Sequence, residues 1–175
     1  MSHDTSPPQS APEAAASPVV SASLTVRGLA DDWAHCQQVA DYLARFAASD
    51  RFDPEQLTTR LSTYLNEVLE LVLRSEPGEG AVVITVERAA DRLQIAVAVP
   101  ADRDGGEYLR SSMRAAAEPD VAAAYRRSFA AQVQAGDDEG VGVGLLELIA
   151  LHGIKLGLRE AEGGLVLSMI VPHEP

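Results

Sequence analysis

Apolar residues recur along this chain with two spacings, one typical of helices and one typical of strands. Between residues 54 and 74 they return every three or four positions, which predicts one long helix with a buried stripe. Asp53 and Pro54 mark its start, because an aspartate accepts hydrogen bonds from the first free amides and a proline has its φ already set for the first helical position. Asn66 and Glu70 lie one turn apart on the opposite side of this helix. The stripe consists of Leu57, Leu61, Leu65, Val68 and Val72.

Strict alternation of apolar with smaller or polar residues predicts the strands. Residues 82–86 and 93–99 form an antiparallel pair with one covered face. Residues 154–158 and 165–171 form a second pair, joined by a glycine turn at 162–164. A short strand is expected at residues 24–26, and a helix begins after it at Asp31 or Asp32. That helix carries Trp33, Val39, Tyr42, Leu43 and Phe46.

The second half of the chain adds helices and two loops. Residues 107–135 are rich in Ala, Arg and Ser, and Pro119 divides them into two helical pieces. The stretch 101–106 is predicted to be a loop, as is 136–144, and a short helix follows at 145–151. This order of elements predicts an α/β fold, an α+β sandwich with helices packed on one face of a mixed, mostly antiparallel sheet.

The first 22 residues repeat Pro, Ser and Ala, a composition that buries too little apolar surface to offset the entropy of ordering. We therefore predict a disordered tail at 1–22 and a single domain at 23–173. Of the 175 residues, 46% are hydrophobic, which is enough for a core. No signal peptide and no apolar run of membrane-spanning length is apparent, so the chain is expected in the cytoplasm and not in a membrane.

The net charge of the chain excludes one class of function. There are 26 Asp and Glu residues against 14 Lys and Arg, a formal net charge of −12 at pH 7. A nucleic acid would be repelled at long range, so nucleic-acid binding is excluded as the main function. The single cysteine, Cys36, is expected to be a small hydrophobe in a helix, which is consistent with a reducing compartment.

The most specific local feature is a run of three alternate glycines, Gly140, Gly142 and Gly144, that leads into an apolar helix. Glycines let a ligand approach the backbone closely, and the free amides of a helix start attract anions. Neither a Walker lysine nor a preceding strand accompanies this loop. A tight turn into a helix with no ligand explains the glycines equally well.

The long helix with its polar residues, the strand pair, the glycine loop and the final hairpin together resemble the Bergerat-fold ATP-binding domain. This domain is shared by gyrase, histidine kinases and anti-sigma serine kinases. The resemblance covers about residues 24–172 and rests most on the glycine loop and on the hairpin end at 163–172. The layout, with its helical segment at 107–135, is most similar to the small bacterial kinases of partner-switching systems, including the SiaB-like group.

The resemblance implies site residues. In an active member the long helix offers a Glu that polarises the attacking group and, four residues later, an Asn that ligates Mg²⁺. Here Asn66 falls at the Glu position and Glu70 at the Asn position, so Glu70 becomes the expected Mg²⁺ ligand and the general base is absent. Glu67 lies about 100° around the helix from Asn66 and is not expected to replace it.

The family also holds adenine with an Asp after a central strand, and the expected position here is Val99. Asp102 or Asp104 could replace it, and Asp104 is preferred because Gly105 follows it. An Asp followed by Gly is, however, also the commonest solvated turn. The acidic residues 137–139 before the glycine loop would repel a triphosphate. The cations proposed to offset them are Arg110, Arg114, Arg126 and Arg127.

Three functions remain open. The first is a regulatory module with weakened or lost nucleotide binding that acts on a protein partner, by resemblance a STAS-type or similar switch protein, with a homodimer also implied. The second is an active serine/threonine kinase that uses ATP and Mg²⁺, with Glu70 on the metal. The third is an α/β scaffold with no cofactor, in which the glycine loop is only a turn.

Overall fold

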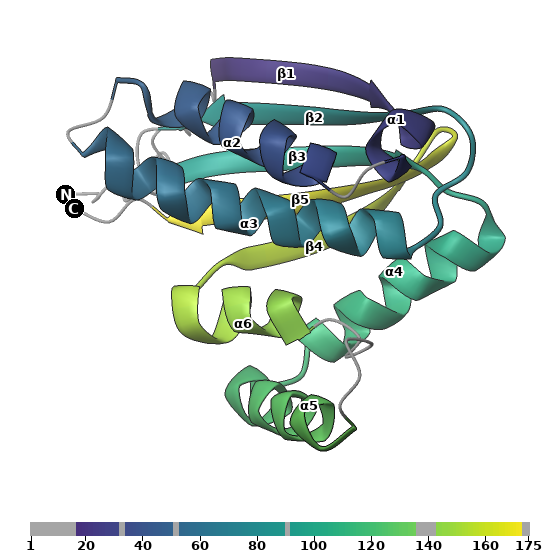
Figure 1. Cartoon of the computed structure of the whole chain (residues 1–175). Helices are drawn as coiled ribbons and strands as arrows, with labels where there is room; N and C mark the ends of the chain where they lie inside the picture. Colours follow the sequence, from purple (N-terminus) through teal and green to yellow (C-terminus); the bar gives the residue numbers. More distant parts are fainter. Residues whose placement is uncertain (1–16, 32–33, 51–52, 90–91, 136–142, 173–175) are drawn as a thin grey trace, which may run out of the picture.

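The fold is built on one antiparallel sheet of five strands (Figure 1). The strands are β1 (Ser17–Thr25), β2 (Ala81–Arg88), β3 (Arg92–Pro100), β4 (Lys155–Ala161) and β5 (Gly164–Pro172), in the spatial order β1-β2-β3-β5-β4. Every neighbouring pair is antiparallel, so the predicted α/β class with an antiparallel sheet is confirmed. The computed structural model describes residues 17–31, 34–50, 53–89, 92–135 and 143–172.

The two long helices α2 (Ala34–Ala48) and α3 (Pro54–Arg74) cover one face of the sheet, with the short α1 (Val26–Ala30) at the end of β1 (Figure 1). The helices of the second half lie on the side of β4. They are α4 (Arg103–Ala116), α5 (Val121–Ala135) and α6 (Val143–His152). Here α5 packs against α6 and α4 and lies away from the sheet (Figure 1). No helix within the described residues combines the length and apolar character that crossing a bilayer demands.

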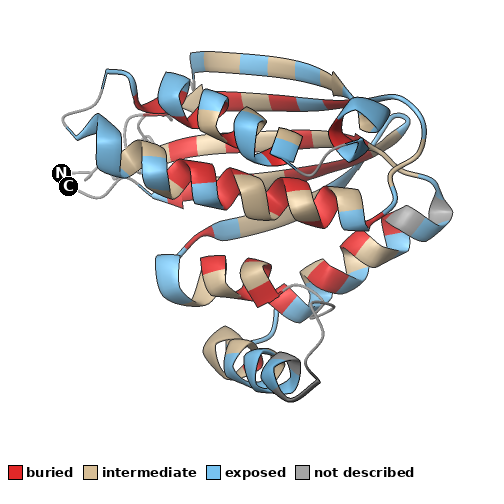
Figure 2. Cartoon of the chain, in the orientation of Figure 1, coloured by how far each residue is buried: buried red, intermediate tan, exposed pale blue. Residues whose placement is uncertain are grey.

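The core lies between the sheet and α2 and α3 (Figure 2). Along β3 every second residue is buried, and the register places Ile95 opposite Val86 and Val97 opposite Ile84. The predicted stripe of α3 faces these residues, with Leu61, Leu65, Val68 and Val72 at most 1% exposed. Each fully buried aliphatic side chain contributes about 1.5–3 kcal/mol of hydrophobic stabilisation, so this layer holds the helices on the sheet.

The start of α3 follows the predicted signal, and the structure also shows how the helix ends. Asp53 is its N-cap, and its carboxylate accepts a hydrogen bond from the backbone amide of Gln56 at 3.1 Å. At the other end the hydroxyl of Ser75 donates to the carbonyl of Val72 at 2.6 Å, and Glu76 adopts a positive φ of 48°. The helix is therefore fixed at both ends, which determines where its polar side chains lie.

Two boundaries differ most from the prediction; in addition, the helix α1 was not predicted, and α6 begins at Val143, inside the predicted loop at 136–144. Strand β1 begins at Ser17, so residues 17–22, predicted to be part of a disordered tail, belong to the sheet. The physical reason is the alternation of Val20, Ala22 and Leu24, which places them opposite three buried residues of β2. Pro18 is tolerated because an edge strand needs fewer backbone donors than a central one. Residues 1–16 and Trp33 lie outside the described residues.

The second difference is at the start of α4. The predicted loop at 101–106 is largely the first turn of this helix, because α4 begins at Arg103 and the amide of Gly106 donates to the carbonyl of Asp102 at 3.1 Å. Leu109, which is fully buried, anchors the helix. Pro119 lies between α4 and α5, as predicted.

Candidate functional site

The site begins where α3 meets the start of α6. Gly144 lies in the first turn of α6, and the carboxyl group of Glu67 occupies the space where a side chain of residue 144 would start. A Cβ atom placed there would lie 1.6 Å from Oε2 of Glu67, a distance that no real contact allows. The first turn of a helix carries a partial positive charge that attracts a carboxylate. The glycine at 144 therefore permits a direct approach of Glu67 to the helix start.

The predicted pair Asn66 and Glu70 is also brought together on α3. The side-chain amide of Asn66 donates a hydrogen bond to Oε1 of Glu70 at 2.6 Å, and both side chains are half-buried. Because the amide is engaged in this bond, it holds the Glu70 carboxylate in one orientation. The two residues thus act as a unit on the side of α3 next to Glu67.

The position of Glu67 adds a residue that the sequence did not select. Glu67 was not expected to replace Asn66, because it lies about 100° around the helix from it, and the structure places its carboxyl group over Gly144. The reason is that α6 packs against a second side of α3, where Tyr64 stacks near His152 with ring centroids 5.1 Å apart. A signal was present in the sequence, because Tyr64 and Leu71 flank Glu67 at helical spacing and both are buried.

Three carboxylates interact at this junction, and we call Glu67, Glu70 and Glu147 the carboxylate cluster. Burial raises the pKa of Glu67 above its usual value, and the negative charges of Glu70 and Glu147 raise it further, while Arg74 acts in the opposite direction. A half-buried carboxyl group under this repulsion binds a proton or a nearby cation more readily than an exposed glutamate does. Among the residues that the structure describes, no three Asp, Glu, His or Cys side chains are placed to hold a metal ion together.

The other predicted site residues do not join the carboxylate cluster in the described structure. Asp104 is exposed in the first turn of α4, whereas the cluster lies on α3 and α6. Gly140 and Gly142 lie outside the described residues, as do residues 137–139. The structure therefore brings together Asn66 and Glu70, and places Gly144 against their neighbour Glu67.

The arginines expected to offset a phosphate charge have other partners. Arg110 pairs with Glu160 of β4 at 2.6 Å, and Arg114 pairs with Glu107 of its own helix at the same distance. Arg127 of α5 pairs with Glu118 at 2.7 Å, and Arg126 is exposed. These pairs lie at the surface, so the guanidinium groups can exchange partners at little cost.

Cys36 of α2 is fully buried. Burial raises the pKa of its thiol, and the charge of Glu70 raises it further. A thiol that resists ionisation is a poor nucleophile, so the structure agrees with a packing role for this cysteine.

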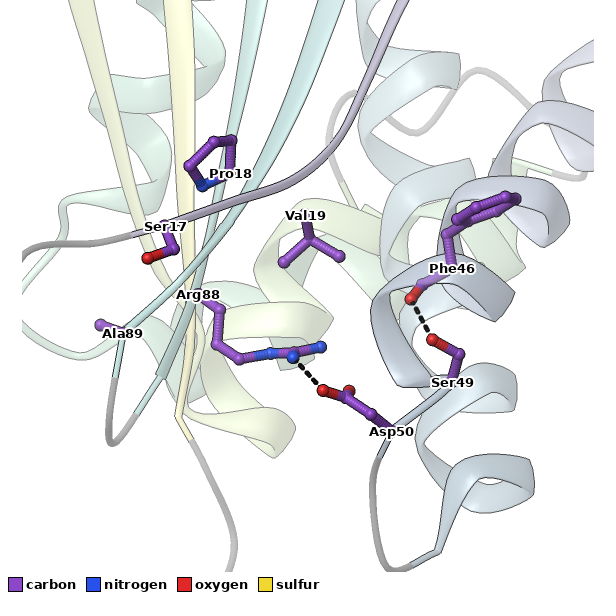
Figure 3. A pocket seen from close by; sticks show the side chains of 8 residues that line it. All are labelled: Ser17, Pro18, Val19, Phe46, Ser49, Asp50, Arg88 and Ala89. Atoms are coloured by element: carbon purple, nitrogen blue, oxygen red, sulfur yellow. Dashed lines mark hydrogen bonds and ion pairs between the residues drawn. The ribbon is translucent and has the colours of Figure 1, made fainter.

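A pocket of about 480 Å³ lies elsewhere, where the start of β1 meets the end of α2 (Figure 3). Its charged side chains pair with each other, since Arg88 forms an ion pair with Asp50 and also donates to the carbonyl of Ala47 at 3.0 Å. It shares no residue with the carboxylate cluster. Its lining consists of Ser17, Pro18, Val19, Phe46, Ser49, Asp50, Arg88 and Ala89.

The fold defines the class of this protein as an α/β domain with helices on one face of an antiparallel sheet. A chain of the SiaB–SiaC complex from Pseudomonas aeruginosa has a similar structure, with a TM-score of 0.59 over 88% of this chain and 89% of that chain. The two sequences are 17% identical, so the similarity shows a shared fold alone. No protein-family model matches the chain, and no curated protein matches it.

Proposed function

We propose that this chain is a cytoplasmic signalling protein of a partner-switching system, with a Bergerat-like domain that acts by contact with a protein partner. Two observations support the proposal. The structural neighbour is a chain of a complex between two proteins, and the resemblance in the sequence implies a STAS-type or similar switch partner. In this proposal nucleotide binding is weakened or lost.

The observation that carries the loss of nucleotide binding is the position of Glu67. Its carboxyl group lies over Gly144 at the start of α6, where the resemblance places the phosphates of a nucleotide. Glu70 and Glu147 add negative charge nearby. Two unit charges of like sign about 4 Å apart repel by about 4 kcal/mol near a protein surface, so a triphosphate is strongly disfavoured unless Mg²⁺ accompanies it.

Calorimetric titration of the full chain with ATP and Mg²⁺ tests this proposal. We expect little or no heat, corresponding to a dissociation constant weaker than about 1 mM. The Glu67→Gln variant keeps the shape of the side chain and removes its charge, so it is expected to bind at least about tenfold more tightly. Glu55→Gln, which also removes one carboxylate of α3 but from its exposed first turn, is the matched control and leaves the affinity unchanged. Low-micromolar binding by the unmodified chain contradicts the proposal.

An active serine/threonine kinase is the second candidate, and one observation favours it. Glu67 has a raised pKa and lies against the first turn of α6. A carboxyl group of this kind is suited to accept a proton from an attacking hydroxyl. In this candidate Glu70 would hold Mg²⁺, which would supply positive charge to offset the phosphates of ATP. Asn66 would orient Glu70, Gly140, Gly142 and Gly144 would line the phosphates, and Asp104 would contact adenine.

Phosphate transfer separates the two candidates. The kinase requires transfer from ATP to a serine or threonine of the partner, and Glu67→Gln abolishes this transfer while the partner still binds. In the proposed regulatory module, no transfer occurs and Glu67→Gln leaves partner binding intact. A Glu70→Ala variant that transfers phosphate at the normal rate rules out Glu70 as the metal ligand.

A further inference from the structure

The pocket at the start of β1 borders an irregularity in that strand. The register of β1 against β2 shifts between Pro18 and Val20, so Val19 has no opposite residue in β2. This is a β-bulge, which leaves the extra residue outside the ladder and re-aims side chains, often next to a functional site. Val19 and Pro18 both line the pocket (Figure 3). The bulge therefore shapes one wall of the pocket.

Arg88 supplies the positive charge of this pocket. Its side chain leaves the end of β2 and is 25% exposed. Nη2 donates to the carbonyl of Ala47 at 3.0 Å, Nη1 pairs with Asp50, and the buried Nε donates to no atom of the described residues. A guanidinium has five N–H donors, so donors remain for a ligand. A buried donor without a partner calls for an explanation, and a bound group that accepts from the guanidinium is one.

Asp50 supplies a negative charge beside the guanidinium. Its side chain is 61% exposed, so the carboxylate stays accessible to solvent while it pairs with Arg88. Figure 3 shows the Arg88 side chain extending from β2 toward Asp50. Exposed ion pairs contribute little to stability, so a ligand can share this pair at little cost. The pocket thus offers both signs of charge next to each other.

The rest of the lining is uncharged, and the pocket has the size of a small-molecule site. Its volume is about 480 Å³, and such sites usually measure about 300–1,000 Å³. Pro18, Val19 and Ala89 contribute apolar surface, and Phe46, which is 47% exposed, adds to it. Small-molecule sites are mostly apolar, with a few polar groups that fix the orientation of the ligand. Here the pair of Arg88 and Asp50 is that polar part.

We propose that this pocket binds a free α-amino acid with a large apolar side chain. A ligand with one charge meets one attractive and one repulsive group, because Arg88 and Asp50 are in contact. A zwitterion meets two attractive groups, since its carboxylate lies on the guanidinium and its ammonium group on the Asp50 carboxylate. It also carries no net charge, so a chain of net charge −12 does not repel it. The proposal is independent of nucleotide binding and of the protein partner.

Calorimetric titration of the full chain with L-leucine tests the proposal. We expect a dissociation constant below about 1 mM. N-acetyl-leucine lacks the ammonium group and leucinamide lacks the carboxylate, so each is expected to bind at least about tenfold more weakly. Glycine keeps both charges but has no apolar side chain, and it is also expected to lose about tenfold or more. Leucine that gives no heat at about 10 mM, or charge-deleted analogues that bind as well as leucine, overturns the proposal.

Two variants test the charged pair. Arg88→Gln removes the guanidinium and Asp50→Asn removes the carboxylate, and each is expected to weaken leucine binding at least about tenfold. Arg159→Gln, which removes an exposed guanidinium from β4, is the matched control and leaves the affinity unchanged. Leucine binding that survives Arg88→Gln unchanged contradicts the proposal.

A spectroscopic measurement on the unmodified chain locates the ligand without any variant. Leucine is expected to shift the NMR signals of the backbone amides of Val19, Ser49 and Ala89, which line the pocket. The amide of Gly144, at the α3–α6 junction, is expected to keep its position. Shifts confined to that junction place the ligand elsewhere and overturn the proposal.

Discussion

The α3–α6 junction and the edge of β1 are opposites in charge. The junction gathers the carboxylates of Glu67, Glu70 and Glu147 around a half-buried contact, whereas β1 has no charge over its whole length. A concentration of like charge in a partly dry site controls which small ions or protons can enter. Strand β1 instead carries a proline and a β-bulge between Pro18 and Val20, which protect an edge strand without charge. The comparison shows that the acidic character of this chain is distributed unevenly.

The largest effect is expected from a substitution at the junction. Gly144→Val puts a branched side chain where the Glu67 carboxyl group lies, and overpacking of this kind destabilises by about 1–3 kcal/mol. Chemical denaturation measures the loss. In a Glu67→Ala background the obstructing carboxyl group is gone, so the same substitution is expected to cost at least about 1 kcal/mol less. Equal losses in the two backgrounds would show that Glu67 and Gly144 are not coupled.

A smaller effect is expected from the charge of Glu67. Its pKa is raised by burial and by its acidic neighbours, so the folded state binds this proton more tightly than the unfolded state does, and the stability that Glu67 contributes is lost as the pH rises through its folded pKa. Glu67→Gln removes this loss and is expected to be more stable than the unmodified chain at pH 7, by about 0.5 kcal/mol or more. The advantage shrinks as the pH falls toward the ordinary pKa of glutamate. Denaturation curves at several pH values measure it, and an advantage that stays constant with pH argues against titration of this carboxyl group.

The smallest effect is expected at the other edge of the sheet. Arg110→Ala removes the ion pair with Glu160 of β4, whose side chain is 72% exposed. Exposed pairs contribute little, so the change in stability is expected to stay below about 0.5 kcal/mol. Chemical denaturation measures the change. A loss of more than about 1 kcal/mol would show that this pair contributes more than an exposed ion pair usually does.

Much of the fold was predictable from local patterns. The capping signal at Asp53 and Pro54 gave the start of α3, and the alternation in residues 82–99 gave β2 and β3. The first half of β1 was missed because Val20 and Ala22 are small and stand among Ser and Pro, so their alternation is hidden by a composition typical of disordered segments. These residues form a strand because they pair with β2, and this pairing cannot be recognised from the local sequence.

The candidate site was predictable in part. The polar pair Asn66 and Glu70 and the glycine at 144 could be selected from the sequence, and the structure brings the first two into contact. The role of Glu67 could not be selected, because which side of α3 faces α6 depends on how two helices separated by about seventy residues pack. Helical spacing locates side chains around an axis and does not tell which neighbour each side meets.

The order of the strands has a consequence for how the chain is made. Strand β5 is the last of the five in the sequence, yet it lies between β3 and β4 and pairs with both. A nascent chain that has emerged only as far as β4 has no template on which that strand can dock. Completion of the sheet must therefore wait until β5 leaves the ribosome, and a premature stop before Gly164 would leave the centre of the sheet open to chaperones and proteases.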